Sequence, residues 1–450
     1  MPRTRLAFLA LAVVLLAPFG LPSAGAEPAP FHWGVATSGY QAEGSAPDSN
    51  WSRYIAANAG TGGIDPYGNG VDFRHRYRED IRLAAGMGVN TFRFSLEWAR
   101  VQPRPGVWDR RELAYYDDLV RRIRAAGMTP MITLSHFVYP GWVRDNGGFA
   151  ARRTVTDFLA FTEQIVRRYR GEHVLWVTFN EPTVFLGDEL KLGTLDLGRI
   201  PAWRANLVAA HRQAYDLIHR IDPGALVTSN QSFTSVFNPA TDLLVLDAIK
   251  DKLDYLGIDY YYGASLDNLS AINGAFGKLW DIRLEPEGIY DALRYYANRY
   301  PGLPLYIVEN GMPTDNGLPR ADGYTRSAAL RDSIFWVQRA KADGMNVIGY
   351  NYWSITDNYE WGSYRPRFGL YTVDARTDPR LSRRPTDAVA AYRDVIARGG
   401  VPGDYRLVRG PAFCSLDDPP VSCLHPADPN GPRARLGATA GISAARAGVG

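Results

Sequence analysis

The chain has 450 residues, of which 46% are hydrophobic and 22% charged, and its formal net charge at pH 7 is +3. This composition is typical of a globular protein, and the length suffices for one large barrel domain or two to three smaller domains. No run of Lys and Arg is dense enough to indicate a nucleic-acid or anionic-membrane partner.

The N-terminus has the layout of a secretory signal peptide. Arg3 and Arg5 precede an apolar stretch over residues 6–21, and the small residues Ala24-Gly25-Ala26 then form a cleavage site. The apolar stretch is short and interrupted by proline, so an uncleaved anchor helix is the weaker alternative. We therefore expect residues 1–26 to be a signal peptide. The protein would then be secreted, to the extracellular space or the periplasm, without a stable membrane anchor.

Eight short, β-rich apolar runs follow along the chain, separated by stretches with helical spacing. Near-continuous apolar runs are typical of parallel strands that are buried on both faces. The expected strands are residues 32–38, 90–96, 129–136, 175–180, 225–229, 255–261, 304–309 and 347–353. The expected helices include residues 80–87, 111–126, 154–169, 204–220, 289–300, 324–342 and 385–397.

This alternation predicts an α/β fold, a single (β/α)8 barrel over residues 27–400 with a short C-terminal extension over residues 401–450. The alternative is a doubly wound sheet. That fold usually carries a glycine-rich phosphate-binding turn after its first strand, and the chain has no G-x-G-x-x-G motif.

Carboxyl groups stand at the ends of two expected strands, where side chains of such a barrel face the active site. Glu181 follows the fourth strand, and Glu309 ends the seventh, nearly opposite across the barrel mouth. Such a pair suits glycosidic cleavage, with one carboxyl protonated as the acid and the other ionised as the nucleophile. Arg93 would hold Glu309 anionic, and the charge of Glu309 would keep the proton on Glu181.

Each of these motifs alone could be structural. Glu181-Pro182 could end a strand, and Glu309-Asn310-Gly311 could be a turn built on Asn-Gly. His136 could be an ordinary core histidine. Their joint position at strand ends of one barrel favours the catalytic interpretation. Around them, Asn180 can bind a sugar hydroxyl, and Trp353 and Trp361 offer apolar faces to a sugar ring.

Several motifs in this order resemble glycoside hydrolase family 1, the β-glucosidase family, between residues 31 and 374. They are FHWGVATSGYQAEG at 31–44, TFNEP at 178–182, IVENG at 307–311, YWSITDNYEW at 352–361 and RFGL at 367–370. The resemblance implies that Glu181 is the general acid/base and Glu309 the nucleophile.

The resemblance also implies roles for the surrounding residues. The side chains that would bind the hydroxyls of the non-reducing sugar are Gln41, His136, Asn180, Glu360 and Trp361. Trp353 would form the stacking floor, and Tyr261 would lie beside the nucleophile. Asp259 departs from the family, which usually has Asn there. A loop over residues 187–200 would shape the aglycone site. The family needs no metal or other cofactor, and the sequence offers no metal-ligand cluster.

The function implied is a secreted, retaining exo-β-glycosidase, a glucosidase by default, acting on small-molecule or oligosaccharide β-glycosides. Family members that cleave 6-phosphorylated glycosides have a small hydroxyl residue where this chain has Glu360, so neutral sugars are expected. A transglycosidase using the same intermediate is one alternative, and a catalytically silent sugar-binding protein is another. The sugar, the linkage, the aglycone and the oligomeric state stay open.

Cys414 and Cys423 are the two cysteines of the chain. Export makes a disulfide between them plausible, and two free thiols are the alternative. From about residue 430 onward the chain is rich in Ala, Gly and Arg without periodicity, which predicts disorder. Because this region follows the last barrel helix, we expect the bridge to have little effect on catalysis.

Overall fold

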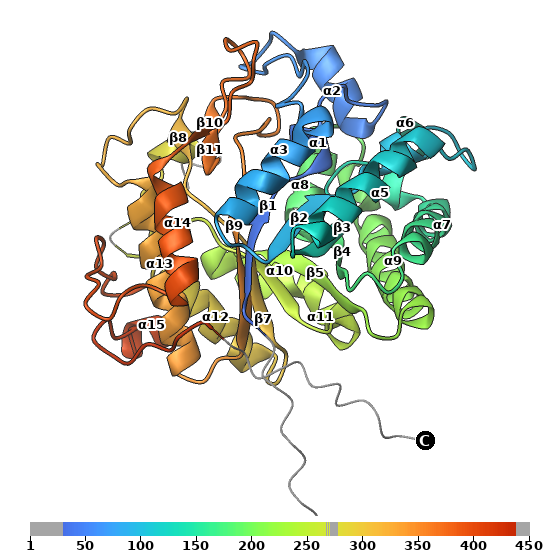
Figure 1. Ribbon diagram of the computed structural model, residues 1–450. Coiled ribbons are helices and arrows are strands. Elements are labelled where there is room, and N and C mark those ends of the chain that lie inside the picture. Colours follow the sequence, from blue (N-terminus) through green and yellow to red (C-terminus); the bar gives the residue numbers. More distant parts are fainter. Residues whose placement is uncertain (1–29, 267, 269, 271–277, 438–450) are drawn as a thin grey trace, which may run out of the picture.

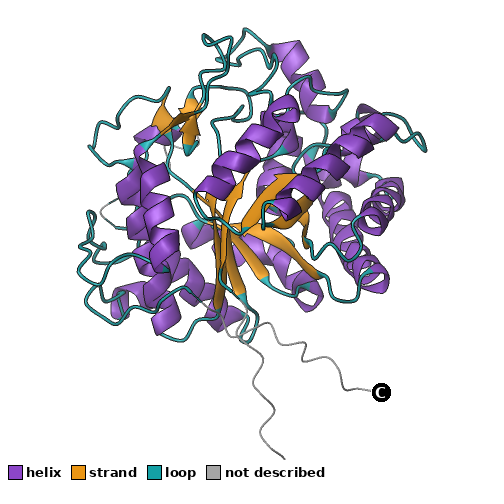
Figure 2. Cartoon of the chain, viewed as in Figure 1, coloured by secondary structure: helices purple, strands orange, loops and turns teal. Residues whose placement is uncertain are grey.

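The apolar runs form eight parallel strands that close into a barrel, which confirms the predicted (β/α)8 fold (Figures 1 and 2). The computed structural model describes residues 30–266, 268, 270 and 278–437. The strands pair in the order β1 (His32–Ala36), β2 (Thr91–Ser95), β3 (Thr129–Ser135), β4 (Leu175–Asn180), β5 (Leu226–Ser232), β6 (Leu256–Asp259), β7 (Leu305–Asn310) and β9 (Val347–Trp353). Pairing of β9 with β1 closes the barrel.

Helices surround the barrel, shown purple around the orange strands in Figure 2. The longer helices are α3 (Phe73–Gly86), α5 (Arg110–Ala125), α7 (Arg153–Arg168), α9 (Ile200–Ile221), α12 (Gly288–Arg299), α13 (Arg326–Ala342) and α14 (Asp387–Arg398). The shorter ones are α1 (Gly39–Ala42), α2 (Asn50–Asn58), α4 (Trp98–Val101), α6 (Gly141–Asp145), α8 (Pro182–Lys191), α10 (Asn238–Leu244), α11 (Leu246–Ile249) and α15 (Val421–Leu424). Two small antiparallel pairs join β8 (Thr314–Asp315) with β10 (Pro366–Arg367), and β11 (Tyr371–Thr372) with β12 (Arg384–Pro385).

Burial follows the apolar pattern of each element. Every residue of β2, β4, β7 and β9 is buried, because side chains fill the barrel on one side and meet the helices on the other. In α7, Phe158, Phe161 and Ile165 are fully buried while Arg167 is exposed. Burying each such apolar side chain contributes about 1.5–3 kcal/mol to folding.

Helix α3 and the segment 187–200 differ from what the sequence predicts. Helix α3 begins at Phe73, well before the predicted start at residue 80, because Phe73, Tyr77 and Ile81 form a buried stripe among charged neighbours. In the sequence these charges hide the apolar spacing. The segment 187–200, expected to be a loop, is helical in part, since its first residues complete α8 and its last one begins α9.

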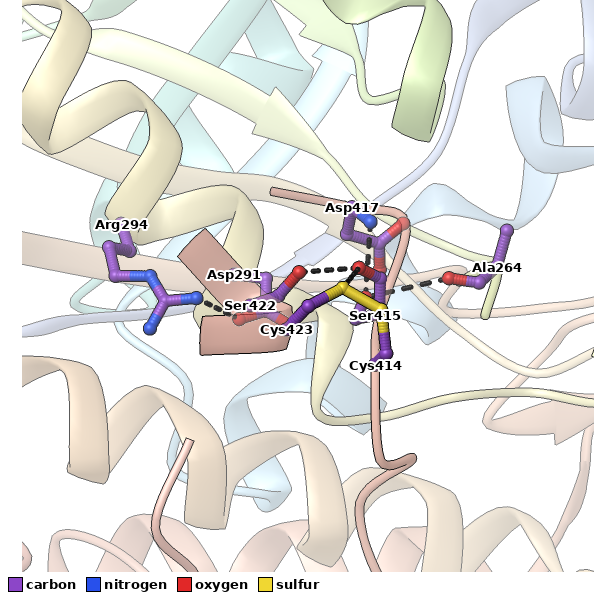
Figure 3. The surroundings of a disulfide bond; sticks show 8 residues. All are labelled: Ala264, Asp291, Arg294, Cys414, Ser415, Asp417, Ser422 and Cys423. Carbon is purple, nitrogen blue, oxygen red and sulfur yellow. Dashed lines mark hydrogen bonds and ion pairs between the residues drawn. A yellow bond between two sulfur atoms is a disulfide. The ribbon is translucent and has the colours of Figure 1, made fainter. Parts of the chain in front are cut away.

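The chain after α14 packs on the outside of the barrel. Figure 1 shows this red segment, with α15, beside α12 and α13. The Tyr405 hydroxyl donates to Asp332 Oδ1 of α13 at 2.7 Å. Cys414 and Cys423 form the predicted disulfide (Figure 3).

The expected disorder from residue 430 is wrong for the described part of that segment. Leu436 is fully buried, and its N–H donates to Gly399 O at 2.7 Å. Packing against the barrel helices orders a stretch that has no regular pattern of its own. The predicted signal peptide, residues 1–26, and residues 438–450 lie outside the described residues. Within the described ranges, no helix is both long and apolar enough to cross a membrane.

Candidate active site

The carboxyl ends of the strands bring the predicted side chains to one face of the barrel. Arg93 lies on β2, Asn180 ends β4, Glu309 lies on β7 and Trp353 ends β9. Glu181 follows β4 directly and is the N-cap of α8. Because all eight strands are parallel, these ends share one rim, the face that carries the active sites of such barrels.

Both carboxylate oxygens of Glu309 have hydrogen-bond donors. Arg93 Nη1 donates to Oε1, and the Tyr261 hydroxyl donates to Oε2 at 2.6 Å. Arg93 is fully buried, and its Nε also donates to Thr133 Oγ1 at 3.1 Å, which fixes the guanidinium plane. The positive charge and the two donors compensate the buried carboxylate and hold it in one orientation, as a carboxylate nucleophile requires.

Glu181 has a very different environment. Burial raises the pKa of its carboxyl to about 8, and the negative charge of Glu309 adds to this shift. The hydrogen bond from the Ser232 hydroxyl and the charge of Arg93 oppose it. Asn180 Nδ2 donates to Glu181 Oε2 at 3.4 Å. At neutral pH, therefore, Glu181 carries a proton that it can give to a leaving group. Two carboxyls in such different surroundings suit the roles of acid and nucleophile.

Asn230 of β5 links the two sides of the site, and it is not among the residues predicted from the sequence. Its Nδ2 donates to Asn180 Oδ1 at 2.7 Å and also to Asp259 Oδ2. Arg93 Nη2 donates to the same Asn180 oxygen at 2.6 Å. The expected strand ended at residue 229, whereas β5 continues through the polar residues that follow. That run of polar residues directly after an apolar strand is the feature of the sequence that could have indicated a site residue on β5.

Asp259 places a third carboxyl beside Glu181 and Glu309. It is buried and lies in register with Glu309 across β6 and β7. Burial raises the pKa of Asp259 well above the usual range, and the charges of Glu309 and Glu181 add to this shift. The positive charge of Arg93 opposes it. Its Oδ1 has no hydrogen-bond partner among the residues that the structure describes. Of these carboxyls, Glu309 is the one that pairs with the Arg93 guanidinium.

A second group of side chains forms a rigid set of hydrogen-bonding positions. Gln41 Nε2 donates to Glu360 Oε2 at 2.9 Å, and Trp353 Nε1 donates to Glu360 Oε1 at 3.1 Å. The Ser38 hydroxyl holds Gln41 Oε1 at 2.7 Å. Burial raises the pKa of Glu360 to about 8. The hydrogen bond from Trp353 opposes this shift, and the charge of Glu309 adds to it. Such a fixed set of donors and acceptors suits sugar hydroxyls.

His136 lies between two indole rings. Its ring centroid is 5.8 Å from that of Trp353 and 5.8 Å from that of Trp361, with each indole tilted by 16°. Burial lowers the pKa of His136 well below its usual value, and the positive charge of Arg93 lowers it further. The imidazole is therefore neutral. The backbone of Trp361 is left-handed, with φ 47°, as is that of Glu181, with φ 37°. Non-glycine residues rarely adopt this conformation, and such strain gathers at functional sites.

All the side chains predicted from the sequence thus lie at the carboxyl face, in two groups. The first comprises Arg93, Asn180, Glu181, Asp259, Tyr261 and Glu309, and the second comprises Gln41, His136, Trp353, Glu360 and Trp361. The groups meet where Tyr261 packs against the cluster that contains Trp353. Their contacts with a substrate stay predictions. Among the described residues, no group of three or more His, Cys, Asp or Glu side chains could hold a metal ion.

A parallel barrel with two such carboxyls and a set of hydroxyl-binding groups defines the class of barrel glycosidases. The chain belongs to glycosyl hydrolase family 1, whose model matches residues 24–243 and 240–401.

Two characterised relatives illustrate the range of similar proteins. The chain is 30% identical over 373 residues to a chloroplast galactolipid galactosyltransferase of Arabidopsis thaliana, covering 72% of this chain and 57% of that protein. The match therefore spans little more than half of that relative. The chain is also 29% identical over 446 residues to thermostable beta-glucosidase B of Thermobispora bispora, covering 82% of this chain and 90% of that one.

A solved structure supports the same assignment. The apo structure of a beta-glucosidase is 28% identical and superposes with a TM-score of 0.70, covering 83% of this chain and 100% of that chain.

Proposed function

We propose that the protein is an exported, retaining exo-β-glycosidase that hydrolyses neutral β-glycosides through a covalent glycosyl-enzyme intermediate. The observation that carries the proposal is the unequal surroundings of the two carboxyls. Arg93 and Tyr261 hold Glu309 for attack, whereas burial and the charge of Glu309 keep a proton on Glu181.

In the first step, a Glu309 oxygen attacks the anomeric carbon while the bond from that carbon to the leaving oxygen breaks. Glu181 gives its proton to the leaving oxygen. Glu309 is then an uncharged ester, so one of the two main causes of the raised Glu181 pKa disappears. The ionised Glu181 can take a proton from water, whose oxygen attacks the anomeric carbon. The ester bond breaks, and the Glu309 carboxylate returns with a second inversion.

The groups around Glu360 favour a neutral sugar. Gln41 and Trp353 orient the two oxygens of Glu360, which can accept hydrogen bonds from hydroxyls at the far end of the ring. Once Glu360 ionises, a phosphate dianion at this position would meet a like charge, at a cost of several kcal/mol, roughly. Glucose is the default sugar on the strength of the family and of relatives named beta-glucosidase.

A transglycosidase is the second candidate function, and the similarity to a galactolipid galactosyltransferase favours it. Both activities share the first step, and they differ in whether water or an acceptor hydroxyl attacks the intermediate. A silent sugar-binding protein is disfavoured, because both carboxyls and their partners are in place.

A panel of aryl β-glycosides, assayed with and without an alcohol acceptor, tests the proposal. Hydrolysis with the β-anomer released first, followed by NMR, is the expected result, and Glu309→Gln is the inactive control. Release of the α-anomer first would contradict a double displacement. Glycoside formation that exceeds hydrolysis at low acceptor concentration would favour the transglycosidase. Binding of glycosides without turnover would leave the silent sugar-binding protein.

The proposed export is supported by the residues that precede the barrel and by the Cys414–Cys423 disulfide, which suits an oxidising compartment. Fractionation of producing cells, with mass spectrometry of the mature N-terminus, tests it. We expect cleavage after Ala26, and an intact Met1 on cytosolic protein would contradict export.

A further inference from the structure

One buried side chain connects the C-terminal segment to the ends of two barrel strands. Asp417 is 1% exposed, and its Oδ1 accepts a hydrogen bond from the hydroxyl of Ser235, the first residue of a short 3-10 helix after β5. Its Oδ2 lies 3.1 Å from the hydroxyl of Tyr260, directly after β6. The match to the family model ends at residue 401, so Asp417 belongs to a segment outside it.

The barrel accommodates Asp417 through a close approach of the backbone. A Cβ atom on Gly288, the first residue of α12, would lie 1.8 Å from the Tyr260 hydroxyl and 1.9 Å from Asp417 Oδ2. A Cβ atom on Gly263 would lie 2.7 Å from the same hydroxyl. Any side chain at Gly288 would displace one or both members of the pair, so glycine here permits the contact.

The loop that carries Asp417 is fixed on both sides. The disulfide closes it, and the Ser422 hydroxyl donates to Ser415 O across it (Figure 3). Arg294 Nε of α12 donates to Asp418 Oδ2 at 2.8 Å. In addition, Leu416 N donates to the backbone oxygen of residue 264 at 2.7 Å. The carboxyl of Asp417 is therefore held at a defined place by the body of the protein.

The hydrogen bonds of the Tyr260 hydroxyl indicate which group donates in its contact with Asp417. The Tyr260 hydroxyl donates to Glu285 O at 2.6 Å, so toward Asp417 it acts as an acceptor. A protonated Asp417 supplies the hydrogen for that bond while its other oxygen accepts from Ser235. Burial raises the pKa of Asp417 to about 8, in keeping with a neutral carboxyl. The charges of Asp291 and Glu285 act in the same direction, while the hydrogen bond from Ser235 opposes the shift.

Tyr260 in turn contacts the strand that carries Glu309. Its N–H donates to Glu309 O at 3.0 Å, and its carbonyl oxygen accepts from Asn310 Nδ2 at 2.6 Å. The next residue, Tyr261, donates its hydroxyl to Glu309 Oε2. The anchored side chain of Tyr260 therefore fixes the backbone from which Tyr261 reaches Glu309.

We propose that Asp417 is a positioning residue for the catalytic site, which acts by anchoring Tyr260 and Ser235 and so holds Tyr261 against Glu309. This inference rests on the proposed function, because positioning is measured through turnover. It replaces the expectation that the segment around the disulfide has little effect on catalysis. A misplacement of reacting groups by about 1 Å can cost about 100-fold in rate, so the effect is measurable.

Three variants test the role of Asp417 with an aryl β-glucoside as substrate. Asp417→Ala should lower kcat about 10- to 100-fold, because the backbone at Tyr260 loses its anchor. Asp417→Asn should stay within about twofold of wild type, since its amide can donate to Tyr260 as the protonated acid does. Tyr405→Phe removes another hydrogen bond between the segment and α13, far from β6 in the chain, and is the matched control for stability.

A double-mutant cycle separates positioning from general destabilisation. Tyr260→Phe should lower kcat as Asp417→Ala does, and the double variant should lose little more, because both changes break one contact. Equal loss of kcat in Tyr405→Phe at a matched fall in melting temperature would overturn the proposal. So would wild-type kcat in Asp417→Ala, or fully additive effects in the double variant.

Binding of an iminosugar by calorimetry distinguishes failure of this inference from failure of the proposed function. Positioning predicts that Asp417→Ala weakens binding about tenfold or more, whereas Tyr405→Phe does not. If the wild type binds the iminosugar but hydrolyses no glycoside, the hydrolase proposal fails and the affinities still test Asp417. If the wild type neither binds nor turns over, both proposals are overturned.

Discussion

Replacing Glu309 with Gln should lower the pKa of Glu181, because the charge of Glu309 is second only to burial among the causes that raise it. The carboxyls of a retaining pair stand about 5.5 Å apart. At that separation, two charges in an effective dielectric of about 20 interact by about 3 kcal/mol, which corresponds to about 2 pH units. In Glu309→Gln, Glu181 should therefore titrate about 2 pH units below the wild-type value, with burial as the remaining cause.

Carbon-13 NMR of labelled Glu carboxyls measures this titration directly, with Glu181→Gln to assign the resonance. In the wild type, the alkaline limb of kcat/KM reports the same proton and should fall near pH 8. Glu360→Gln is the matched control. Glu360 is another carboxyl of the site with a pKa raised to about 8, yet it is not among the main groups that perturb Glu181.

Two results would refute the electrostatic argument. The first is a Glu181 pKa that changes by less than about half a pH unit in Glu309→Gln. The second is an equal shift in Glu360→Gln, which would show that any loss of charge in the pocket has the same effect. A shift confined to Glu309→Gln would support the direct coupling on which the acid and nucleophile roles depend.

Three further results are expected. Glu309→Ala should abolish turnover, and azide should restore part of that turnover, with NMR showing a product of inverted anomeric configuration. Near-normal activity of Glu309→Ala without azide would show that another group is the nucleophile. Glu360→Ser should lower kcat/KM on neutral glycosides more than on their 6-phospho forms, and unchanged neutral-sugar activity would remove the role given to Glu360. The free energy of unfolding should fall between about pH 5 and pH 8. Burial raises the pKa of Glu97 and Glu287 from 4.5 to about 8, so the folded state retains protons that the unfolded chain releases over this range. Denaturant titrations in which the free energy of unfolding rises over this range would contradict the prediction.

The barrel and the positions of the two carboxyls proposed as catalytic follow from local sequence. Each strand contains a mostly apolar run, and burial on both faces of a parallel sheet favours that pattern wherever the strand lies. The placement of Glu181 and Glu309 follows from the same rule, because a residue at the carboxyl end of a parallel strand must reach the same rim as its counterparts. Motif and strand therefore locate the pair without any tertiary contact.

Other parts of the site depend on neighbours that local patterns do not contain. Asn230 acquires a role because β5 extends past its apolar run and its amide meets Asn180 and Asp259 from adjacent strands. The protonation of Asp259 depends on burial and on charges from three other strands or loops. The same Asp in a solvated loop would ionise normally, so its residue type alone decides nothing.

The largest departure from the sequence expectation is the C-terminal segment. Nothing near Asp417 in the chain indicates that its carboxyl meets Tyr260, which precedes it by 157 residues. Local patterns suffice to predict the strands, the carboxyl motifs and the cysteine pair, because each of these lies within a short stretch of adjacent residues. The pKa values of the buried carboxyls and the contact of the C-terminal segment with the barrel follow from folding alone, because desolvation and hydrogen bonding depend on the groups that folding brings together.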